Sequence, residues 1–314
     1  MTSTDSINRA WYESQSAVET FSADDRLEPT LALLLIKYRD LMAGRDVLDI
    51  GVGAGRTTLY LSALTRGYVG IDYSPAMVAH SARRFPQERL ELGDARDLSR
   101  FADASFDLVL FSYAGLGALA HESRLRALSE VTRVIRPGGV FLFSAHNRDY
   151  REARTGPRLR YSRNPLTQLA HVARWVRSAR LHDRLRGLEH ESAEYALIND
   201  GADGFRLLHY YISAGEQRAQ LERHGLRAEL TMDDRCREVA PDTVAADAPW
   251  LWYVARRAIQ SPVTAPSTAA AASAPSAAAT ENIAGGRSRP TATPMPTSGS
   301  VSRLPWSATP RAPT

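Results

Sequence analysis

The stretch LDIGVGAGRTT, residues 48–58, constrains the fold more than any other part of the sequence. An apolar strand that runs into glycines and then into a helix is typical of the turn that holds a nucleotide-like ligand in an open α/β fold. The dinucleotide fingerprint GxGxxG does not fit, because Gly55 comes one residue too early after Gly51 and Gly53. The triphosphate loop GxxxxGK[ST] does not fit either, since this stretch contains no lysine.

Three carboxylates at strand ends narrow the ligand further. Asp49 lies two residues before the first glycine, where it would disfavour a pyrophosphate and suit a positively charged group. Asp72 ends the next apolar strand, in a position that suits an acceptor for two ribose hydroxyls. Asp94 follows a third strand and suits an adenine amine, with the N–H of Ala95 beside it. The loop and its carboxylates therefore predict a site for a cationic adenosine that carries no phosphate.

Apolar strands alternate with amphipathic helices from residue 46 to residue 147. The stretches 106–111 and 140–143 are almost wholly apolar, as expected of strands buried on both faces of a parallel sheet. This alternation predicts an α/β fold with a Rossmann-like, doubly wound and mostly parallel sheet. The expected strands are 46–50, 68–72, 89–95, 106–113 and 140–147, and the expected helices are 56–65, a segment from 74 and 123–135, with a turn at 136–139.

The segment after Asn147 changes character. Residues 148–190 contain eleven arginines against four acidic residues. We expect a helical insertion over the open end of the sheet, with a helix at about 165–189. Two interpretations remain open, a solvated basic face and a lid or docking surface for an anionic group. The side chains expected to point inward are Leu166, Leu169, Val172, Ala173 and Val176.

The ends of the chain complete the predicted organisation. Residues 9–43 are predicted to be helical, with Pro29 in a first turn. A strand at 209–213, a helix closed by Gly225 and an antiparallel pair at 226–233 and 250–257 would finish the sheet. The predicted parts are an N-terminal helical cap (1–43), a cofactor-binding core (44–147), an arginine-rich insertion or substrate lid (148–208), the last strands and helix (209–260), and a disordered tail rich in Ala, Pro, Ser and Thr (261–314).

Composition limits the class of protein. The formal net charge is +4, and 38 of the 39 basic residues are arginine, so charge alone is weak evidence for a nucleic-acid partner. A single cysteine, Cys236, excludes internal disulfides and metal sites built from several cysteines. The start of the chain lacks the pattern of a secretory signal, and its apolar run at 31–36 is far shorter than the roughly 20 residues of a membrane span. We expect a cytoplasmic protein without a membrane span or a metal.

Five motifs in order resemble the class I S-adenosylmethionine-dependent methyltransferases: VLDIGVGAG, VGIDYSPAMV, LELGDARDL, FDLVLFS and RVIRPGGVFLF. The resemblance covers about residues 30–147 and implies S-adenosylmethionine as the cofactor. It implies that Asp49 organises the methionine end, directly or through water. For Gly55 close helix–strand packing remains an open alternative to cofactor contact. The cofactor contacts implied or expected on this basis are Asp49, Gly51, Gly53, Gly55, Asp72, Tyr73, Asp94, Ala95 and Phe111, with Ser112 beside Phe111 near the sulfonium.

The acceptor side is predicted from the carboxyl ends of the strands, where open α/β sheets bind their ligands. His146, Tyr113 and His121 are the candidate catalytic residues, and His121 is also a candidate helix-start residue. Asn147, Tyr210 and Tyr12 are candidate substrate-binding residues, with Tyr12 as a possible aromatic cover.

Methyl transfer to a small molecule by in-line displacement is the predicted function. The alternatives are a nucleic-acid-associated methyltransferase or RNA-binding protein that uses the arginine-rich segment, a nicotinamide oxidoreductase, and a non-catalytic module that binds S-adenosylmethionine. The acceptor itself has no readable signature in the sequence.

Overall fold

A computed structural model describes residues 4–23 and 25–259. These residues lie within one compact unit, Met1–Val263. The tail predicted at 261–314 lies outside the described residues.

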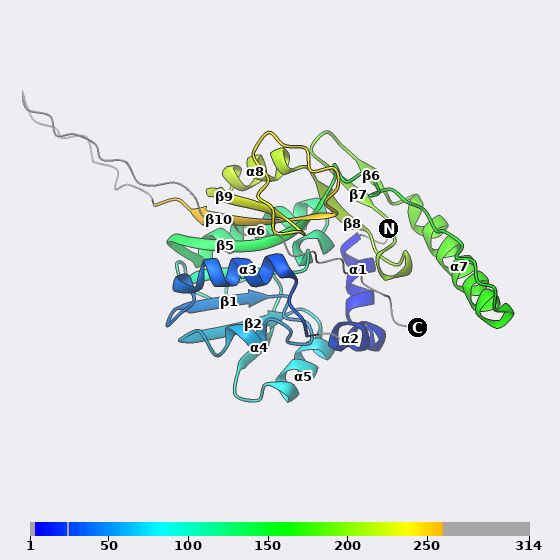
Figure 1. Cartoon of the computed structure of the whole chain (residues 1–314). Helices are drawn as coiled ribbons and strands as arrows, with labels where there is room; N and C mark the ends of the chain where they lie inside the picture. The colour runs from blue at the N-terminus through cyan, green and yellow to red at the C-terminus, as the bar shows by residue number, and fades with distance from the viewer. Residues whose placement is uncertain (1–3, 24, 260–314) are drawn as a thin grey trace, which may run out of the picture. The chain divides into compact units, whose positions relative to one another are not determined.

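A mixed sheet forms the centre of this unit (Figure 1). Five strands run parallel in the order β3-β2-β1-β4-β5. β10 pairs antiparallel with β5, and β9 pairs antiparallel with β10. The Rossmann-like sheet with an antiparallel last strand is thereby confirmed. The strand bounds are β1 (Asp46–Ile50), β2 (Gly67–Asp72), β3 (Arg89–Leu92), β4 (Phe106–Phe111), β5 (Ile135–Asn147), β9 (Leu226–Asp233) and β10 (Trp250–Arg257).

Helices cover both faces of the sheet because alternate strand residues are apolar on both sides. On one face, α3 (Pro29–Lys37) and α4 (Thr58–Leu61) pack against a core centred on Trp252. On the other face, α6 (His121–Val134) and α8 (Ala214–Arg223) pack against a core that contains Phe141 and Phe143. α5 (Pro75–Arg84) follows β2 and packs beside β3.

β5 is longer than its neighbour β4, and its overhang carries a second group of strands. Phe143 pairs with Phe111, the last residue of β4, whereas His146 and Asn147 pair with β8 (His209–Ile212). β8 continues antiparallel to β7 (Tyr195–Ile198), which pairs with β6 (His190–Glu191). The sequence analysis did not predict β6 or β7.

Three predicted elements differ in the structure. The helical segment 9–43 is divided into α1 (Thr4–Tyr12), α2 (Gln15–Ser22), α3 and the 3₁₀ turn η1 (Arg39–Leu41), and the Ser14 side chain caps α2. The helix expected at 56–65 shortens to α4. The turn expected at 136–139 belongs to an irregular start of β5, where Gly138 has φ +80° and the pairing with β4 shifts register.

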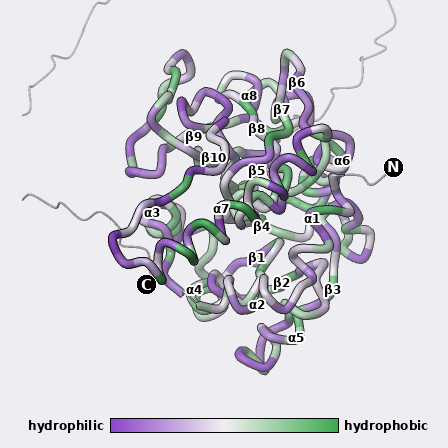
Figure 2. The backbone as a smooth tube through the Cα atoms, turned by 90° about the vertical axis from the view of Figure 1, so that its right-hand side faces the viewer, coloured by the Kyte–Doolittle hydropathy of each residue, from purple (hydrophilic) through white to green (hydrophobic). Residues whose placement is uncertain are grey.

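The sequence analysis predicted the helix of the arginine-rich insertion at the right residues, but the side it expected to face inward is exposed. α7 (Pro165–Arg186) leaves Leu166 77% and Leu169 68% exposed, and Leu185 is its one buried residue. Figure 1 shows α7 at the margin of the unit, away from β1 and β2. Figure 2 is turned so that this side faces the viewer, and there α7 is seen over the middle of the unit. β8 pairs with the end of β5, and β7 and β6 follow it in the sheet, so these strands occupy the edge that α7 was expected to cover.

Within residues 4–23 and 25–259, no helix has both the length and the apolar character needed to cross a membrane.

A buried arginine joins three elements on the α6 face of the sheet. Arg124 of α6 is fully buried, and its Nε donates to Oε1 of Gln220 at 2.9 Å. Its Nη1 donates to the carbonyl of Leu116 in η2 (Gly115–Ala118) at 3.0 Å, and its Nη2 donates to Gln217. Burial lowers the pKa of Arg124 to about 10, so the guanidinium stays charged at neutral pH and depends on these acceptors.

We predict that Arg124→Met lowers the free energy of unfolding by about 3 kcal/mol, because it leaves buried acceptors on α8 and η2 without a donor. Urea denaturation followed by circular dichroism measures the change. Arg126→Met is the matched control, since Arg126 is exposed on the same helix, and it should change stability by less than about 0.5 kcal/mol. Equal effects of the two substitutions would contradict a structural role for Arg124.

Candidate functional site

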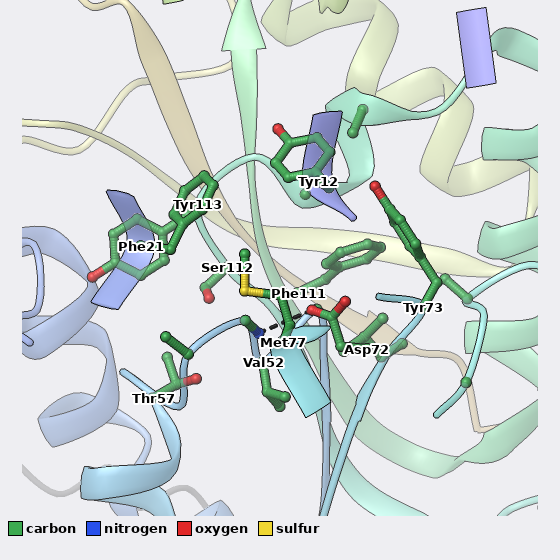
Figure 3. Close-up of a pocket in the computed structure, with 18 of the residues that line it drawn as sticks. Tyr12, Phe21, Val52, Thr57, Asp72, Tyr73, Met77, Phe111, Ser112 and Tyr113 are labelled. Atoms are coloured by element: carbon green, nitrogen blue, oxygen red, sulfur yellow. Dashed lines mark hydrogen bonds between the residues drawn. The ribbon is translucent and has the colours of Figure 1, made fainter. Parts of the chain in front are cut away.

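A pocket lies at the carboxyl ends of β1, β2 and β4 (Figure 3). The loops after these strands and after β3 supply most of the wall, and α1 and α2 add Tyr12 and Phe21. The sequence argument had predicted a ligand at this edge of the sheet.

The glycine loop turns its backbone toward the pocket. The N–H groups of Gly51 and Val52 both donate to the carbonyl of Ile71, which ties the loop to β2. Gly53 has φ +54°, and a Cβ added there would meet nothing within 4 Å, so a ligand can approach its backbone closely. Gly55 does not line the pocket, and its Cβ would lie 2.5 Å from the ring of Phe85. The structure therefore favours the packing alternative for Gly55.

Asp72 stands in the pocket wall where β2 ends. Its side chain is buried, and its Oδ1 and Oδ2 accept hydrogen bonds from the N–H groups of Ser74 at 2.8 Å and Gly53 at 2.9 Å. Burial raises the pKa of Asp72, and the two backbone donors oppose that effect. Each carboxylate oxygen has a further lone pair, so this side chain can accept two neighbouring hydroxyls of a ligand.

Asp49 lies behind the wall rather than in it. Its Oδ2 accepts hydrogen bonds from Thr57 Oγ1 at 2.6 Å and from the Tyr68 hydroxyl at 2.8 Å. Its buried Oδ1 has no partner among the described residues. Burial raises the pKa of Asp49 to about 7. This position does not support direct contact between Asp49 and a ligand. The negative charge of Asp49 can still attract a cation beside Thr57, which lines the pocket.

Asp94 and Ala95 line the pocket after β3. Arg96 Nε donates to Asp94 Oδ1 at 2.9 Å and Arg96 Nη2 donates to Oδ2 at 2.6 Å. Burial would raise the pKa of Asp94, but the bonds to Arg96 outweigh it and lower the pKa. A ligand amine at Asp94 would therefore share a carboxylate that Arg96 already orients.

Aromatic side chains close one side of the pocket (Figure 3). The rings of Tyr12 and Phe21 stack with their centroids 5.8 Å apart, and Tyr12 meets Tyr73 edge-on at 6.3 Å. All three residues line the pocket. The position of Tyr12 suits the aromatic cover that the sequence suggested.

Two residues that the sequence analysis missed hold α1 in this place. Asn8 is buried, and its Nδ2 donates to the carbonyls of Ala118 at 2.7 Å and Leu208 at 2.8 Å. Asp5 accepts from the N–H of Ala120 at 2.7 Å. No local signal marks these residues, because their partners are more than a hundred positions away in the chain.

The loop after β4 brings Phe111, Ser112 and Tyr113 into the wall, as expected. The Tyr113 hydroxyl donates to the carbonyl of Arg26 and accepts from the N–H of Glu28, both at 3.3 Å. Burial raises the pKa of Tyr113, and this does not favour a role as a base. The Arg56 guanidinium lies 4.3 Å from the centre of the Tyr113 ring and also lines the pocket. The sequence analysis missed Arg56 although it directly follows the glycine loop.

Two predicted acceptor residues belong to a different cluster. His121 and Tyr210 do not line the pocket. His121 begins α6, its Nδ1 lies 2.9 Å from the Tyr210 hydroxyl, and its ring stacks on Tyr195 with centroids 4.2 Å apart. The register of β8 turns Tyr210 toward Arg124, away from the pocket. This placement supports the helix-start alternative for His121.

Asn147 and His146 also lie outside the pocket wall. Asn147 is buried, and its Nδ2 donates to the carbonyls of Ala245 at 2.8 Å and Ala248 at 3.0 Å, so it holds the loop before β10. The His146 ring packs against Gly117 of η2. Both residues are on the part of β5 that extends past the end of β4. The end of β5 therefore lies beyond the pocket, although it is the end of a parallel strand.

Comparisons with known proteins agree with this fold and site. The family described as "Methyltransferase domain" matches residues 47–139. A probable S-adenosylmethionine-dependent methyltransferase of Mycolicibacterium smegmatis is 39% identical over 106 residues, which are 34% of this chain and 40% of that protein. The chain spans about two fifths of the length of the curated relatives it matches.

Two solved structures share the fold. The CcbJ methyltransferase from Streptomyces caelestis aligns with a TM-score of 0.53 at 18% identity, over 82% of this chain and 99% of that chain. The 1,6-didemethyltoxoflavin-N1-methyltransferase of Burkholderia thailandensis, with 1,6-didemethyltoxoflavin and S-adenosylhomocysteine bound, aligns with a TM-score of 0.51 at 16% identity, over 80% and 88%. Sequence and fold together assign the domain at residues 47–139 to the class I S-adenosylmethionine-dependent methyltransferases.

Proposed function

We propose that this chain transfers the methyl group of S-adenosylmethionine to a small-molecule acceptor. The observation that carries the proposal is Asp72, a buried carboxylate in the pocket wall whose two oxygens each keep a free lone pair. A ribose would place its two hydroxyls there. The adenine would then lie toward Asp94 and Ala95, and the methionine part would follow the exposed backbone of Gly53.

The residues around the pocket would orient the reactants rather than react themselves. When bound, the cofactor supplies an activated methyl group on a sulfonium, which is a good leaving group. Tyr12 and Phe21 would cover the cofactor and exclude water. Phe111 packs against the glycine loop, and a Cβ added at Gly51 would lie 3.0 Å from its ring. An acceptor would enter beside Ser112 and Tyr113, where the wall after β4 begins.

Two observations support a small acceptor over a nucleic acid. The arginines of α7 are not in the pocket wall, so they offer no phosphate contact at the ligand site itself. The Burkholderia thailandensis enzyme, which shares the fold, holds the small molecule 1,6-didemethyltoxoflavin together with S-adenosylhomocysteine.

Asp72→Ala should weaken binding of both S-adenosylmethionine and S-adenosylhomocysteine by about 10- to 100-fold, because hydrogen bonds to a charged acceptor contribute about 1.5–3 kcal/mol. Isothermal titration calorimetry measures both ligands. Asp40→Ala is the matched control, since the Asp40 side chain is 91% exposed. Circular dichroism separates lost binding from lost folding. If neither ligand binds the parent chain and Asp72→Ala behaves like it, the proposed function fails.

The affinity for S-adenosylmethionine should rise as the pH increases through about 7. Burial raises the pKa of Asp49 to about 7, so this carboxyl becomes ionised over that range and then attracts the cationic ligand. Asp49→Asn should reduce this rise by about fivefold between pH 6 and pH 8, because a charge behind the wall of a partly solvated pocket has a modest effect on a cation in it. Calorimetric titrations compare the parent and the variant at each pH, so the ionisation of the ligand itself affects both equally. If the affinities of the two proteins change with pH in the same way, Asp49 plays no part.

A further inference from the structure

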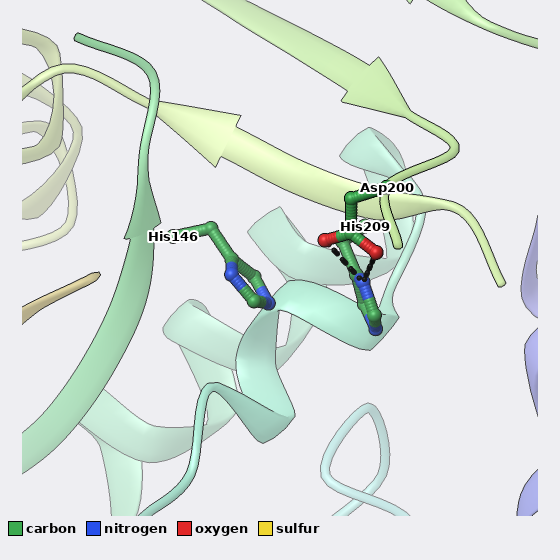
Figure 4. A group of neighbouring side chains, drawn as sticks. All are labelled: His146, Asp200 and His209. Carbon is green, nitrogen blue, oxygen red and sulfur yellow. Dashed lines mark hydrogen bonds and ion pairs between the residues drawn. The ribbon is translucent and has the colours of Figure 1, made fainter. Parts of the chain in front are cut away.

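Three side chains from distant parts of the sequence meet beyond the end of β4 (Figure 4). His146 comes from the overhang of β5, His209 begins β8, and Asp200 follows β7. One possible ligand atom from each residue, two imidazole nitrogens and a carboxylate oxygen, lies within 4.8 Å of the others. Strand pairing brings them together, since His146 is opposite Tyr211 and Ile198 is opposite His209.

The spacing of the Asp200–His209 pair resembles that of two ligands on one ion. His209 Nδ1 lies 3.0 Å from both Oδ1 and Oδ2 of Asp200. A single N–H points in one direction and makes one well-aligned hydrogen bond rather than two equal ones. Neighbouring ligands of a tetrahedral ion with bonds of about 2.1 Å are about 3.4 Å apart, so a small movement of the two side chains would bring them to coordination distances. In the structure itself the two groups are hydrogen-bonded.

The carboxylate is held in place by residues that would form a second layer around an ion. The Tyr211 hydroxyl donates to Asp200 Oδ2 at 2.7 Å, and the N–H of Ala202 donates to Oδ1 at 3.0 Å. Such outer hydrogen bonds orient the carboxylate ligands of metal sites. Asp200 is 8% exposed, and its one ion pair within the described part of the chain is with His209. A buried carboxylate is stabilised by hydrogen bonds and by positive charge nearby.

His146 completes the group from the overhang of β5. No hydrogen bond joins a ring nitrogen of His146 to the described residues, and the ring lies 4.7 Å from that of His209 and 4.9 Å from that of Tyr211. Figure 4 shows the ring directed toward the Asp200–His209 pair. A neutral imidazole is the form of histidine that binds metals.

We propose that His146, Asp200 and His209 bind a divalent transition-metal ion such as Zn²⁺. Two imidazoles and one carboxylate suit Zn²⁺ and its neighbours in the first row, whereas Mg²⁺ and Ca²⁺ prefer oxygen ligands alone. Three protein ligands leave at least one coordination position for water or another ligand. This site goes against the expectation from sequence that no metal is bound, and it does not depend on the proposed methyl transfer.

The site borders the cofactor pocket without forming part of it. Gly117 of η2 touches the His146 ring, while Gly115 and Ala118 of the same turn line the pocket. The metal group and the pocket can therefore be tested separately.

Metal binding should be measured on the full-length, tag-free chain after treatment with a chelator. Titration with Co²⁺ should give visible d–d absorption that saturates at one ion per chain, and Zn²⁺ should displace it. His146→Gln and His209→Gln should each weaken the binding by at least 100-fold, since a lost direct ligand has a larger effect than the roughly 10- to 100-fold loss of an outer partner. His190→Gln, at an exposed histidine of β6, is the control and should bind like the parent.

The same experiment can overturn the proposal. Absence of stoichiometric binding in the parent, or equal losses in the His146 and His190 variants, would exclude the site. His146→Gln keeps the test valid if the His209 variant does not fold, because His146 makes no hydrogen bonds that the fold could lose. Calorimetry with S-adenosylhomocysteine on the same samples reports the cofactor pocket separately.

Discussion

The length of β5 relative to β4 is the constraint on which the rest of the structure depends. Pairing ends at Phe111 and Phe143, so the last four residues of β5 project past its neighbour. Ser144 then accepts a hydrogen bond at 2.7 Å from the N–H of Ala114, which holds the loop after β4 against the pocket. The same overhang gives β8 its place in the sheet. The pairing of β5 with β4 and β8 thus positions the pocket wall on one side of η2, and His146, Asp200 and His209 on the other.

Each carboxylate near the pocket is balanced in a different way. Asp72 has backbone N–H donors, Asp94 has the guanidinium of Arg96, and Asp49 has only two hydroxyls. A chain with a formal charge of +4 therefore has an acidic interior at this edge of the sheet. This arrangement suits a ligand that carries positive charge and hydroxyl groups. It also gives the three carboxyl groups different pKa values, raised for Asp49 and Asp72 and lowered for Asp94.

The sequence predicted regular elements well where a local period is long enough to be seen. The bounds of β9 and β10 match the prediction, and β1 and the antiparallel finish of the sheet do as well. The spacing of Leu166 and Leu169 correctly indicated a helix but not the side that faces the protein, since no sheet surface was left for α7 to cover. In the site, Asp72, Asp94 and the residues after β4 came from motif positions. Asn8 and Asp5 did not, because their roles depend on contacts between distant segments.

By itself the sequence determined the glycine turn, the carboxylates at the strand ends and the alternation that builds a parallel sheet, because each of these is a local pattern of spacing and side-chain chemistry. Tertiary structure decided which strand-end residues meet. Tyr210 and His121 joined the buried Arg124 cluster, and His146 joined Asp200 and His209. Strand register and overhang select these partners, and both follow from how whole elements pack rather than from any single segment.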